Sequence, residues 1–321
     1  MTELRPLLFA LPGNEDMAAA LASHMDAELG EIETRRFPDE ETYLRLLTNP
    51  AGRSIALVCT LDRPDLKFLP IVFAASAARQ LGAIRVGLVA PYLSYLRQDK
   101  RFRDGEAITS EGFAKALSSE VDWLVTVDPH LHRYGSLDAI YSIPSSAVAA
   151  APAIATWISA NVPDPLLIGP DSESDQWVAS VAALVGAPYK VLIKERLGDR
   201  NVRISVPELE GLTGRTPVLV DDIASSAQTM LQATRLLRER TSEPTICIAV
   251  HALFAQESFA ELDAVAGAVV TTNTVLHASN AIDVSPAIAL DAARLINAPP
   301  PSRTDQRRPA FVQTPILDVG K

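Results

Sequence analysis

Short apolar runs rich in β-branched residues alternate with helical stretches along almost the whole chain. In the first half, the runs SIALVCTL and RVGLVAPYL flank a helical stretch that reads FLPIVFAASAARQLGA. The second half repeats this scheme with runs such as TPVLVDDI and TICIAVHALF. Because these runs are apolar at nearly every position, they indicate strands that are buried on both faces in mostly parallel sheets. The sequence therefore predicts an α/β fold in which helices flank the sheets.

The length of 321 residues favours two domains of roughly 150 residues each. The segment IPSSAVAAAPA, residues 143–153, interrupts the alternation and provides the expected boundary. We therefore expect one domain over residues 1–148 and a second over residues 149–298. Residues 299–321 are proline-rich and lack a helical period, so we expect either disorder or an arm lying on another surface.

Charge and apolar content exclude several classes of protein. The formal net charge is −10, from 29 basic and 39 acidic residues, which argues against a general nucleic-acid-binding protein. The N-terminal run LLFALP is too short for a signal-peptide core, and the most apolar helical stretch is too short to span a membrane. Cys59 and Cys247 lie inside apolar runs, so neither a disulfide nor a thiolate metal site is expected. We expect a cytoplasmic protein that binds neither nucleic acid nor membrane.

Polar residues follow several of the predicted strands directly. Pro-Asp follows residues 166–169, Asp-Asp follows residues 218–220, and Asp-Pro-His follows residues 124–127. A longer polar segment, PYLSYLRQDKR, follows residues 88–90. Because ligands of parallel sheets bind beyond the carboxyl ends of the strands, these segments are the candidates for a functional site.

The segment VLVDDIASSAQTM, residues 218–230, has the clearest chemical meaning. A buried strand leads into Asp221 and Asp222, and a loop of small residues then opens a helix. Small residues allow backbone N–H groups to converge on a phosphate at a helix N-terminus. The two carboxylates can accept hydrogen bonds from sugar hydroxyls or bind Mg²⁺. The alternative is an ordinary helix N-cap at Ser225 or Ser226 beside an unrelated acidic pair.

Other segments indicate chemistry only in combination. In RFPDEE, residues 36–41, an aromatic ring flanked by carboxylates suits an adenine, although such a segment is more often a strand edge. Arg97 offers planar donors for a phosphate, although a basic surface turn is the simpler interpretation. His130 alone would indicate acid–base chemistry or a phosphate contact, because Mg²⁺ prefers oxygen. No G-x-x-x-x-G-K-[ST] or G-x-G-x-x-G motif occurs in the chain.

Taken in order, these segments resemble those of the ribose-phosphate diphosphokinase (PRPP synthase) family over about residues 5–295. The segment at residues 91–101 carries the most specific likeness, and residues 218–230 resemble the PRPP-binding motif of type I phosphoribosyltransferases. The resemblance implies two type I phosphoribosyltransferase-like domains with the active site between them. It also implies Mg²⁺-dependent transfer of diphosphate from ATP to the 1-hydroxyl of ribose 5-phosphate, giving PRPP and AMP, in a homo-oligomer.

The resemblance also implies roles for individual residues. As catalytic residues that stabilise the transferring group it implies Lys194 and Arg196. As ATP-binding residues it implies Phe37, Asp39, Glu41, Arg97 and Gln98. As ribose 5-phosphate-binding residues it implies Asp221, Asp222, Ser225, Ser226, Ala227, Gln228 and Thr229. As ligands of Mg²⁺ it implies His130 and Asp171.

The chain departs from the family pattern at three positions. Glu40 and Gln228 each stand where the family usually has glycine, and Glu173 lies in a loop that often carries glycines. These departures leave open a diphosphokinase that acts on another sugar phosphate. A non-catalytic regulatory homologue is a second alternative, although the retained Lys194 and Arg196 argue against it. A simple phosphoribosyltransferase is the third, disfavoured because it needs neither a second domain nor the ATP motifs.

Overall fold

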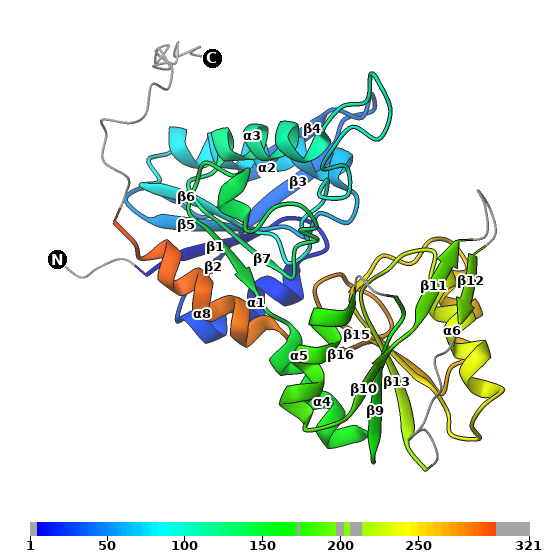
Figure 1. The fold of residues 1–321 in the computed structure, drawn as a ribbon. Coiled ribbons are helices and arrows are strands. Elements are labelled where there is room, and N and C mark those ends of the chain that lie inside the picture. Colours follow the sequence, from blue (N-terminus) through cyan, green and yellow to red (C-terminus); the bar gives the residue numbers. More distant parts are fainter. Residues whose placement is uncertain (1–4, 172–173, 197–201, 206–213, 300–321) are drawn as a thin grey trace, which may run out of the picture.

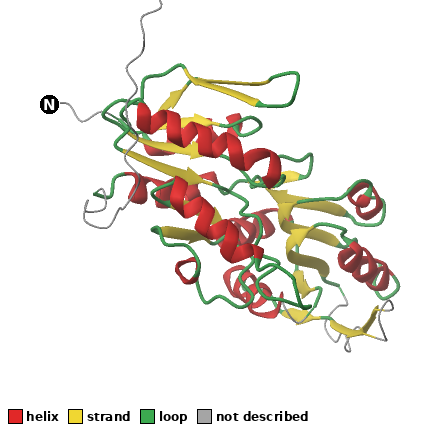
Figure 2. Ribbon diagram, turned by 90° about the horizontal axis from the view of Figure 1, so that it is seen from above, coloured by secondary structure: helices red, strands yellow, loops and turns green. Residues whose placement is uncertain are grey.

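The chain folds around two six-stranded sheets (Figure 1). The computed structural model describes residues 5–171, 174–196, 202–205 and 214–299, with the backbone alone for residues 193–196 and 202–205. In both sheets every pair of neighbouring strands is parallel, and helices lie on the two faces (Figure 2). The predicted α/β class is confirmed.

The first sheet has the order β2-β1-β5-β6-β7-β8. Its strands are β1 (Leu7–Ala10), β2 (Glu28–Gly30), β5 (Ser54–Val58), β6 (Arg85–Val89), β7 (Leu124–Val127) and β8 (Ser145–Val148). The helices that follow these strands in the chain are α1 (Glu15–Met25), α2 (Pro64–Gln80) and α3 (Thr109–Glu120), with a short 3₁₀ helix at Leu137–Ala139. Strands β6 and β7 are buried along their whole length, as their apolar runs predict.

The second sheet has the order β10-β9-β13-β14-β15-β16. Its strands are β9 (Pro165–Gly169), β10 (Tyr189–Val191), β13 (Thr216–Ala224), β14 (Ile246–Ala252), β15 (Ala268–Thr272) and β16 (Asn280–Ile282). The helices of this part of the chain are α4 (Ala151–Asn161), α5 (Asp175–Val185), α6 (Gln228–Arg238), α7 (Ser258–Asp263) and α8 (Ser285–Ile296).

Four strands of the described residues form two antiparallel hairpins outside the parallel sheets. Strand β3 (Ile32–Arg36) pairs with β4 (Thr42–Leu46), and β11 (Ile193–Arg196) pairs with β12 (Val202–Ser205). Strands β10 and β11 follow each other closely in the chain, but β10 is an edge strand of the second sheet, whereas β11 belongs to a hairpin. Charged residues recur in β3, and its side chains are half-buried or exposed, as expected for a strand that is not covered on both faces.

The last helix of the described residues returns to the first sheet. Helix α8 packs against α1 and against β6, β7 and β8, and Figure 1 shows it beside α1. The guanidinium of Arg85 in β6 donates hydrogen bonds to the carbonyl oxygens of Leu295, at 2.5 Å, and Ala298, at 2.8 Å. The expected domain limits of 1–148 and 149–298 stay a prediction, since this helix of the expected second domain covers the first sheet.

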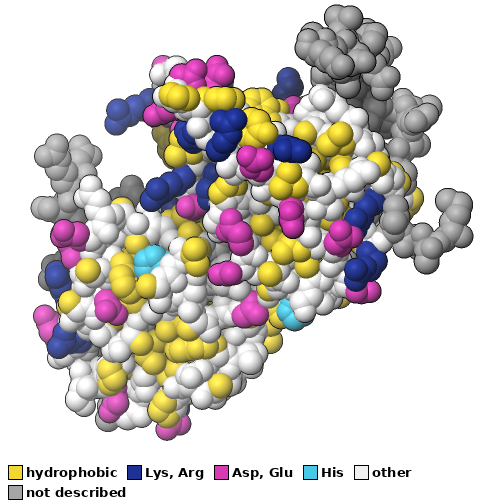
Figure 3. All heavy atoms as spheres, turned by 180° about the vertical axis from the view of Figure 1, so that it is seen from behind, with side chains coloured by type: hydrophobic (Ala, Val, Ile, Leu, Met, Phe, Trp, Pro, Cys, Tyr) yellow, Lys and Arg dark blue, Asp and Glu magenta, His cyan; other side chains and the backbone are white. Residues whose placement is uncertain are grey.

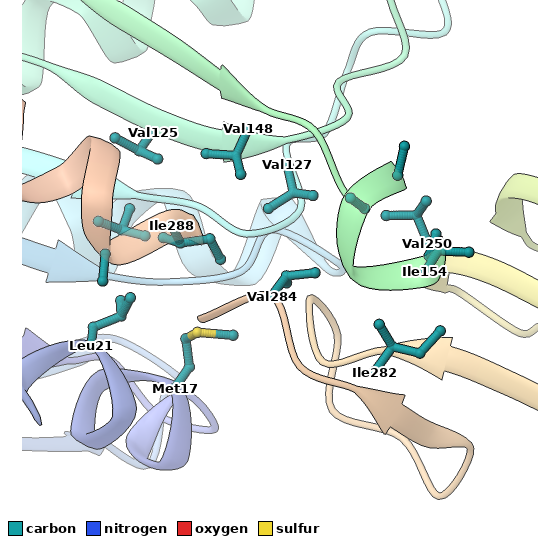
Figure 4. Close-up of a cluster of buried hydrophobic side chains, with 14 of the residues drawn as sticks. Met17, Leu21, Val125, Val127, Val148, Ile154, Val250, Ile282, Val284 and Ile288 are labelled. Atoms are coloured by element: carbon teal, nitrogen blue, oxygen red, sulfur yellow. The ribbon is translucent and has the colours of Figure 1, made fainter. Parts of the chain in front are cut away.

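One hydrophobic cluster continues from the first half of the chain into the second. Figure 4 shows Met17 and Leu21 of α1 near Ile288 of α8, with Ile154 of α4 beside Val250 of β14. These side chains are at most 9% exposed. Because burial of apolar surface is the dominant favourable contribution to folding, this cluster fixes the two halves against each other.

The cysteines, the apolar helices and the charged surface were each considered in the sequence. Cys59 and Cys247 are buried and unpaired, as predicted. No helix of the described residues is long and apolar enough to cross a membrane. On the face shown in Figure 3, Lys and Arg side chains are interspersed with Asp and Glu.

Candidate active site

A cavity of about 420 Å³ lies where loops of the two halves meet. Arg97 and Gln98, from the segment after β6, line it together with Ser225 from the end of β13. Leu253, which follows β14, also contributes to the lining. Two predicted ATP-binding residues therefore share one cavity with a predicted residue of the ribose 5-phosphate loop.

The segment after β13 forms a tight turn into a helix. Strand β13 extends through Asp221 and Asp222 as far as Ala224, so it is longer than the sequence predicted. Ala227 has a left-handed backbone with φ of 53°, and α6 begins at Gln228. The backbone N–H of Leu231 donates to the carbonyl oxygen of Ala227 at 2.8 Å, which closes the first turn. Gln228, which stands where the family usually has glycine, therefore has a helical backbone, and the left-handed residue is its neighbour Ala227.

Asp222 connects the second half to the loop after β7. Its Oδ2 lies 2.5 Å from Nδ1 of His130, the predicted metal ligand. Burial raises the pKa of Asp222, but the hydrogen bond and charge of His130 outweigh burial, so the pKa lies below its usual value. Asp222 is therefore a carboxylate, which can accept hydrogen bonds from sugar hydroxyls or bind a cation.

Asp221 has the opposite electrostatic environment. Burial raises its pKa well above the usual value, and the neighbouring charges of Asp222 and Asp171 raise it further. Asp171 follows β9, and its carbonyl oxygen accepts a hydrogen bond from the Ser174 hydroxyl at 2.6 Å, just before α5 begins. The charges of Asp171, after β9, and of Asp222, in β13, therefore both disfavour the ionised form of Asp221.

The charges around Asp221 indicate whether the site suits Mg²⁺. A divalent cation beside Asp171, Asp221 and Asp222 would favour their ionised forms, and carboxylate oxygens are ligands that Mg²⁺ prefers. Among the described residues, no three His, Cys, Asp or Glu side chains form a ready-made metal site. Mg²⁺ commonly takes one or two carboxylates and completes its shell with water and substrate phosphates, so this donor set fits it.

The predicted adenine loop lies at the turn of the β3–β4 hairpin. Phe37 is 39% exposed, and the Arg35 guanidinium lies 4.7 Å from its ring centroid. The same guanidinium lies 4.1 Å from the ring of Tyr43, so cation–π contacts hold the three side chains together. Asp39 Oδ1 accepts a hydrogen bond from the backbone N–H of Glu41. The ring of Phe37 is therefore held in place by its neighbours and remains partly exposed.

The other predicted residues are placed less completely. Ser226 and Gln228 are exposed and Thr229 is half-buried around the start of α6. Lys194 and Arg196 lie in β11, but their side chains, like Glu173 as a whole, lie outside the described residues.

Several residues of this region were missed by sequence reasoning. Asp62 and Thr109 line the cavity, as does Ser94 of the candidate segment at residues 91–101. His251 is buried against Tyr92, another lining residue. Asp62 could have been found, because it lies a few residues beyond the end of β5 and so near the carboxyl edge of the sheet. His251 gave no such signal, because it lies within an apolar run.

Comparison with known proteins gives the family of the chain. The model for the N-terminal domain of ribose phosphate pyrophosphokinase matches residues 7–120, and the model for the phosphoribosyl transferase domain matches residues 136–285. A ribose-phosphate pyrophosphokinase of Methanopyrus kandleri is 33% identical over 273 residues, which cover 84% of this chain and 92% of that protein. The chain belongs to the ribose-phosphate pyrophosphokinase family.

Further relatives agree with this family. A ribose-phosphate pyrophosphokinase of Saccharolobus solfataricus is 33% identical over 287 residues, covering 84% of this chain and 94% of that protein. The crystal structure of a phosphoribosylpyrophosphate synthetase from Mycobacterium smegmatis has the same fold, with a TM-score of 0.78 at 22% identity. That alignment covers 91% of this chain and 98% of the other. The recognition of the family from sequence motifs is confirmed.

Proposed function

We propose that this protein transfers the diphosphoryl group of Mg-ATP to the 1-hydroxyl of ribose 5-phosphate, giving PRPP and AMP. One observation carries this proposal: the cavity between the halves is lined both by Arg97 and Gln98 and by Ser225 of the loop after β13. A nucleotide and a sugar phosphate bound by these groups would share one enclosure. Relatives named ribose-phosphate pyrophosphokinase support the same reaction.

The sugar phosphate would bind at the end of β13. The Asp222 carboxylate, kept ionised by His130, would accept hydrogen bonds from ribose hydroxyls together with Asp221. The turn from Ser225 to Thr229 would bind the 5-phosphate through backbone N–H groups and hydroxyls at the start of α6. Gln228 is exposed and helical, so no left-handed glycine is required at that position.

The nucleotide would bind on the other side of the cavity. Arg97 and Gln98 would contact its phosphates and base, with Phe37, Asp39 and Glu41 of the β3–β4 hairpin receiving the adenine. The exposed ring of Phe37 is consistent with a hairpin that serves a neighbouring subunit, so the proposal includes a homo-oligomer.

Mg²⁺ would be held by Asp171 and His130, and would neutralise charge on the phosphates during transfer. Lys194 and Arg196 would stabilise the charge that develops on the transferring group. The raised pKa of Asp221, to which the charges of Asp222 and Asp171 contribute, supports a cation bound beside these acids. The chain's own groups otherwise bind and orient the two substrates.

Product analysis tests the proposal and its alternatives together. Purified protein is incubated with Mg-ATP and a panel of sugar phosphates, and AMP, ADP and the phosphorylated sugar are identified by mass. We expect AMP and PRPP in equal amounts with ribose 5-phosphate, and neither product when EDTA removes the Mg²⁺. Turnover of another sugar phosphate alone would show a different diphosphokinase. Nucleotide binding without any turnover would favour the regulatory homologue.

A further inference from the structure

A buried histidine links the two halves of the chain beside the candidate active site. His251, near the end of β14, is 1% exposed. Its Nδ1 lies 2.9 Å from the Thr274 hydroxyl, and its Nε2 lies 3.4 Å from the carbonyl oxygen of Asp128. The Asp128 carbonyl belongs to the first half, directly after β7, and the ring of Tyr92 from that half lies 4.8 Å away.

The partners of His251 determine which ring nitrogen carries the proton. A carbonyl oxygen only accepts, so Nε2–H donates to Asp128, and Nδ1 accepts from the Thr274 hydroxyl. Burial lowers the pKa of His251 to about 4, which is consistent with a neutral ring. The Val250 carbonyl oxygen lies 2.7 Å from the Thr272 hydroxyl and 3.0 Å from the Thr274 hydroxyl. With Thr272 donating to this carbonyl, the single proton of the Thr274 hydroxyl is available to Nδ1 of His251.

A second hydrogen bond holds Thr274 to the first half. The Thr60 hydroxyl donates to the Thr274 carbonyl oxygen at 2.6 Å and accepts from the backbone N–H of Tyr92 at 3.1 Å. Thr60 and Thr274 are both buried, so each of these bonds is shielded from water. Thr274, the hydrogen-bond partner of His251 Nδ1, is therefore held in a fixed position relative to the first sheet.

The acceptor of His251 is itself part of a constrained loop. Asp128 has a left-handed backbone with φ of 32°, which is unfavourable for a residue other than glycine. Its carboxylate accepts hydrogen bonds from the backbone N–H of Ala150, at 3.0 Å, and from Trp177 Nε1 in α5, at 3.4 Å. The loop after β7 is thus held from three directions, and His251 holds its main chain.

His130 lies two residues beyond this anchored carbonyl and reaches across to Asp222 at 2.5 Å. We propose that His251 is a positioning residue, which fixes the Asp128–His130 loop so that the ATP-binding half and the sugar-binding half stay at transfer distance. This inference rests on the proposed function for the identity of the reaction. The hydrogen bonds of His251 are observed independently of that function. His251 touches neither reacting group, so its effect would be transmitted through the position of His130.

Three variants separate positioning from simple stability. His251→Phe keeps a ring of similar size but removes both hydrogen bonds, whereas His251→Gln keeps an amide N–H that can donate to Asp128. The control is Ser146→Ala, because the Ser146 hydroxyl bonds Asp291 of α8 at 2.6 Å, away from the site. We expect His251→Phe to lower kcat about 10-fold to 100-fold, because small displacements of reacting groups are costly. KM for each substrate should change less than about 3-fold. His251→Gln should recover most of the loss, and Ser146→Ala should leave kcat unchanged.

Hydrogen–deuterium exchange provides a readout that needs no turnover. Residues 128–132 should exchange faster in His251→Phe than in the wild-type chain, and His251→Gln should restore their protection. Unchanged exchange in His251→Phe would overturn the positioning role, as would faster exchange with an unchanged kcat. A wild-type protein that forms no PRPP would instead refute the proposed function, and the exchange result would still decide the role of His251.

Discussion

At the scale of single residues, burial and neighbouring charges give similar side chains of the site different pKa values. Asp221 and Asp222 are adjacent in β13, yet the pKa of Asp221 is raised and that of Asp222 is lowered. The difference follows from His130, which bonds Asp222. His251 is close to both halves, but its burial keeps it neutral. Sequence motifs identified the acidic pair but contained no information about which carboxyl group has the raised pKa.

The neutral state of His251 predicts a pH dependence of stability. Its pKa in the folded chain is lowered to about 4, below the ordinary value of 6.5, chiefly by burial. Between these values the unfolded chain binds more protons, so stability falls as the pH falls from about 6.5 to about 4. This residue alone should cost about 3 kcal/mol over that range, at 1.36 kcal/mol per pH unit. Urea unfolding between pH 6.5 and pH 4 should show the wild type losing about 3 kcal/mol of stability relative to His251→Gln, whereas parallel curves would contradict this prediction.

The proposed roles of Lys194 and Arg196 predict a selective loss of turnover. If their cations act on charge in the transition state, Lys194→Ala and Arg196→Ala should each lower kcat about 10²-fold or more. Binding of ATP in the ground state, measured by calorimetry, should change much less. Lys190→Ala, a lysine on the neighbouring strand β10, is a suitable control. Near-normal turnover in both variants would remove the catalytic assignment and favour the regulatory alternative.

At the scale of elements, the two glycine departures turn out to be different in kind. Glu40, in the β3–β4 turn, has φ of 71°, so the left-handed backbone is kept without the glycine. Gln228 is the first residue of α6 and has no such strain, because the left-handed residue is Ala227. The sequence shows that both positions lack the usual glycine. Only the backbone dihedral angles show that Glu40 is left-handed whereas Gln228 is helical.

This difference predicts opposite effects of the same substitution. Glu40→Gly should stabilise the chain by about 1 kcal/mol, since a left-handed backbone costs a non-glycine residue about that much. Gln228→Gly should destabilise it by roughly 1 kcal/mol through helix propensity, without a gain in ribose 5-phosphate efficiency. Thermal unfolding of the two variants, with steady-state kinetics of the second, measures both effects. A large kinetic gain from Gln228→Gly would contradict the helical phosphate loop and indicate a different natural sugar.

At the scale of the whole molecule, the end of the chain completes the first half. Most strands and helices were predictable, because runs such as residues 85–93 and 245–254 are apolar at nearly every position. The order of the motifs also predicted that ATP and sugar-phosphate groups would meet. The return of α8 to the first sheet was not predictable, since its apolar stripe does not specify which sheet it covers. The contacts of His251 depend on the same long-range packing.

The position of α8 predicts which of its side chains matter for stability. Ile288 is 0% exposed in the shared cluster, whereas Leu290 on the same helix is 74% exposed. Ile288→Ala should lower the free energy of unfolding by about 2–5 kcal/mol, because it removes buried methyl groups and leaves a cavity. Leu290→Ala should change it by no more than about 0.5 kcal/mol. Chemical denaturation of the two variants makes the comparison, and equal effects would show that α8 does not pack as described.

The fate of the β-phosphorus of ATP distinguishes diphosphoryl transfer between the two halves from transfer of a single phosphoryl group. ATP labelled with ³²P at the β-position is incubated with Mg²⁺, ribose 5-phosphate and the protein, and the labelled products are separated. Attack on the β-phosphorus transfers the β- and γ-phosphates together, so we predict that the label leaves the nucleotide and appears in PRPP, with unlabelled AMP. Label retained in ADP, beside an unlabelled sugar bisphosphate, would contradict the account.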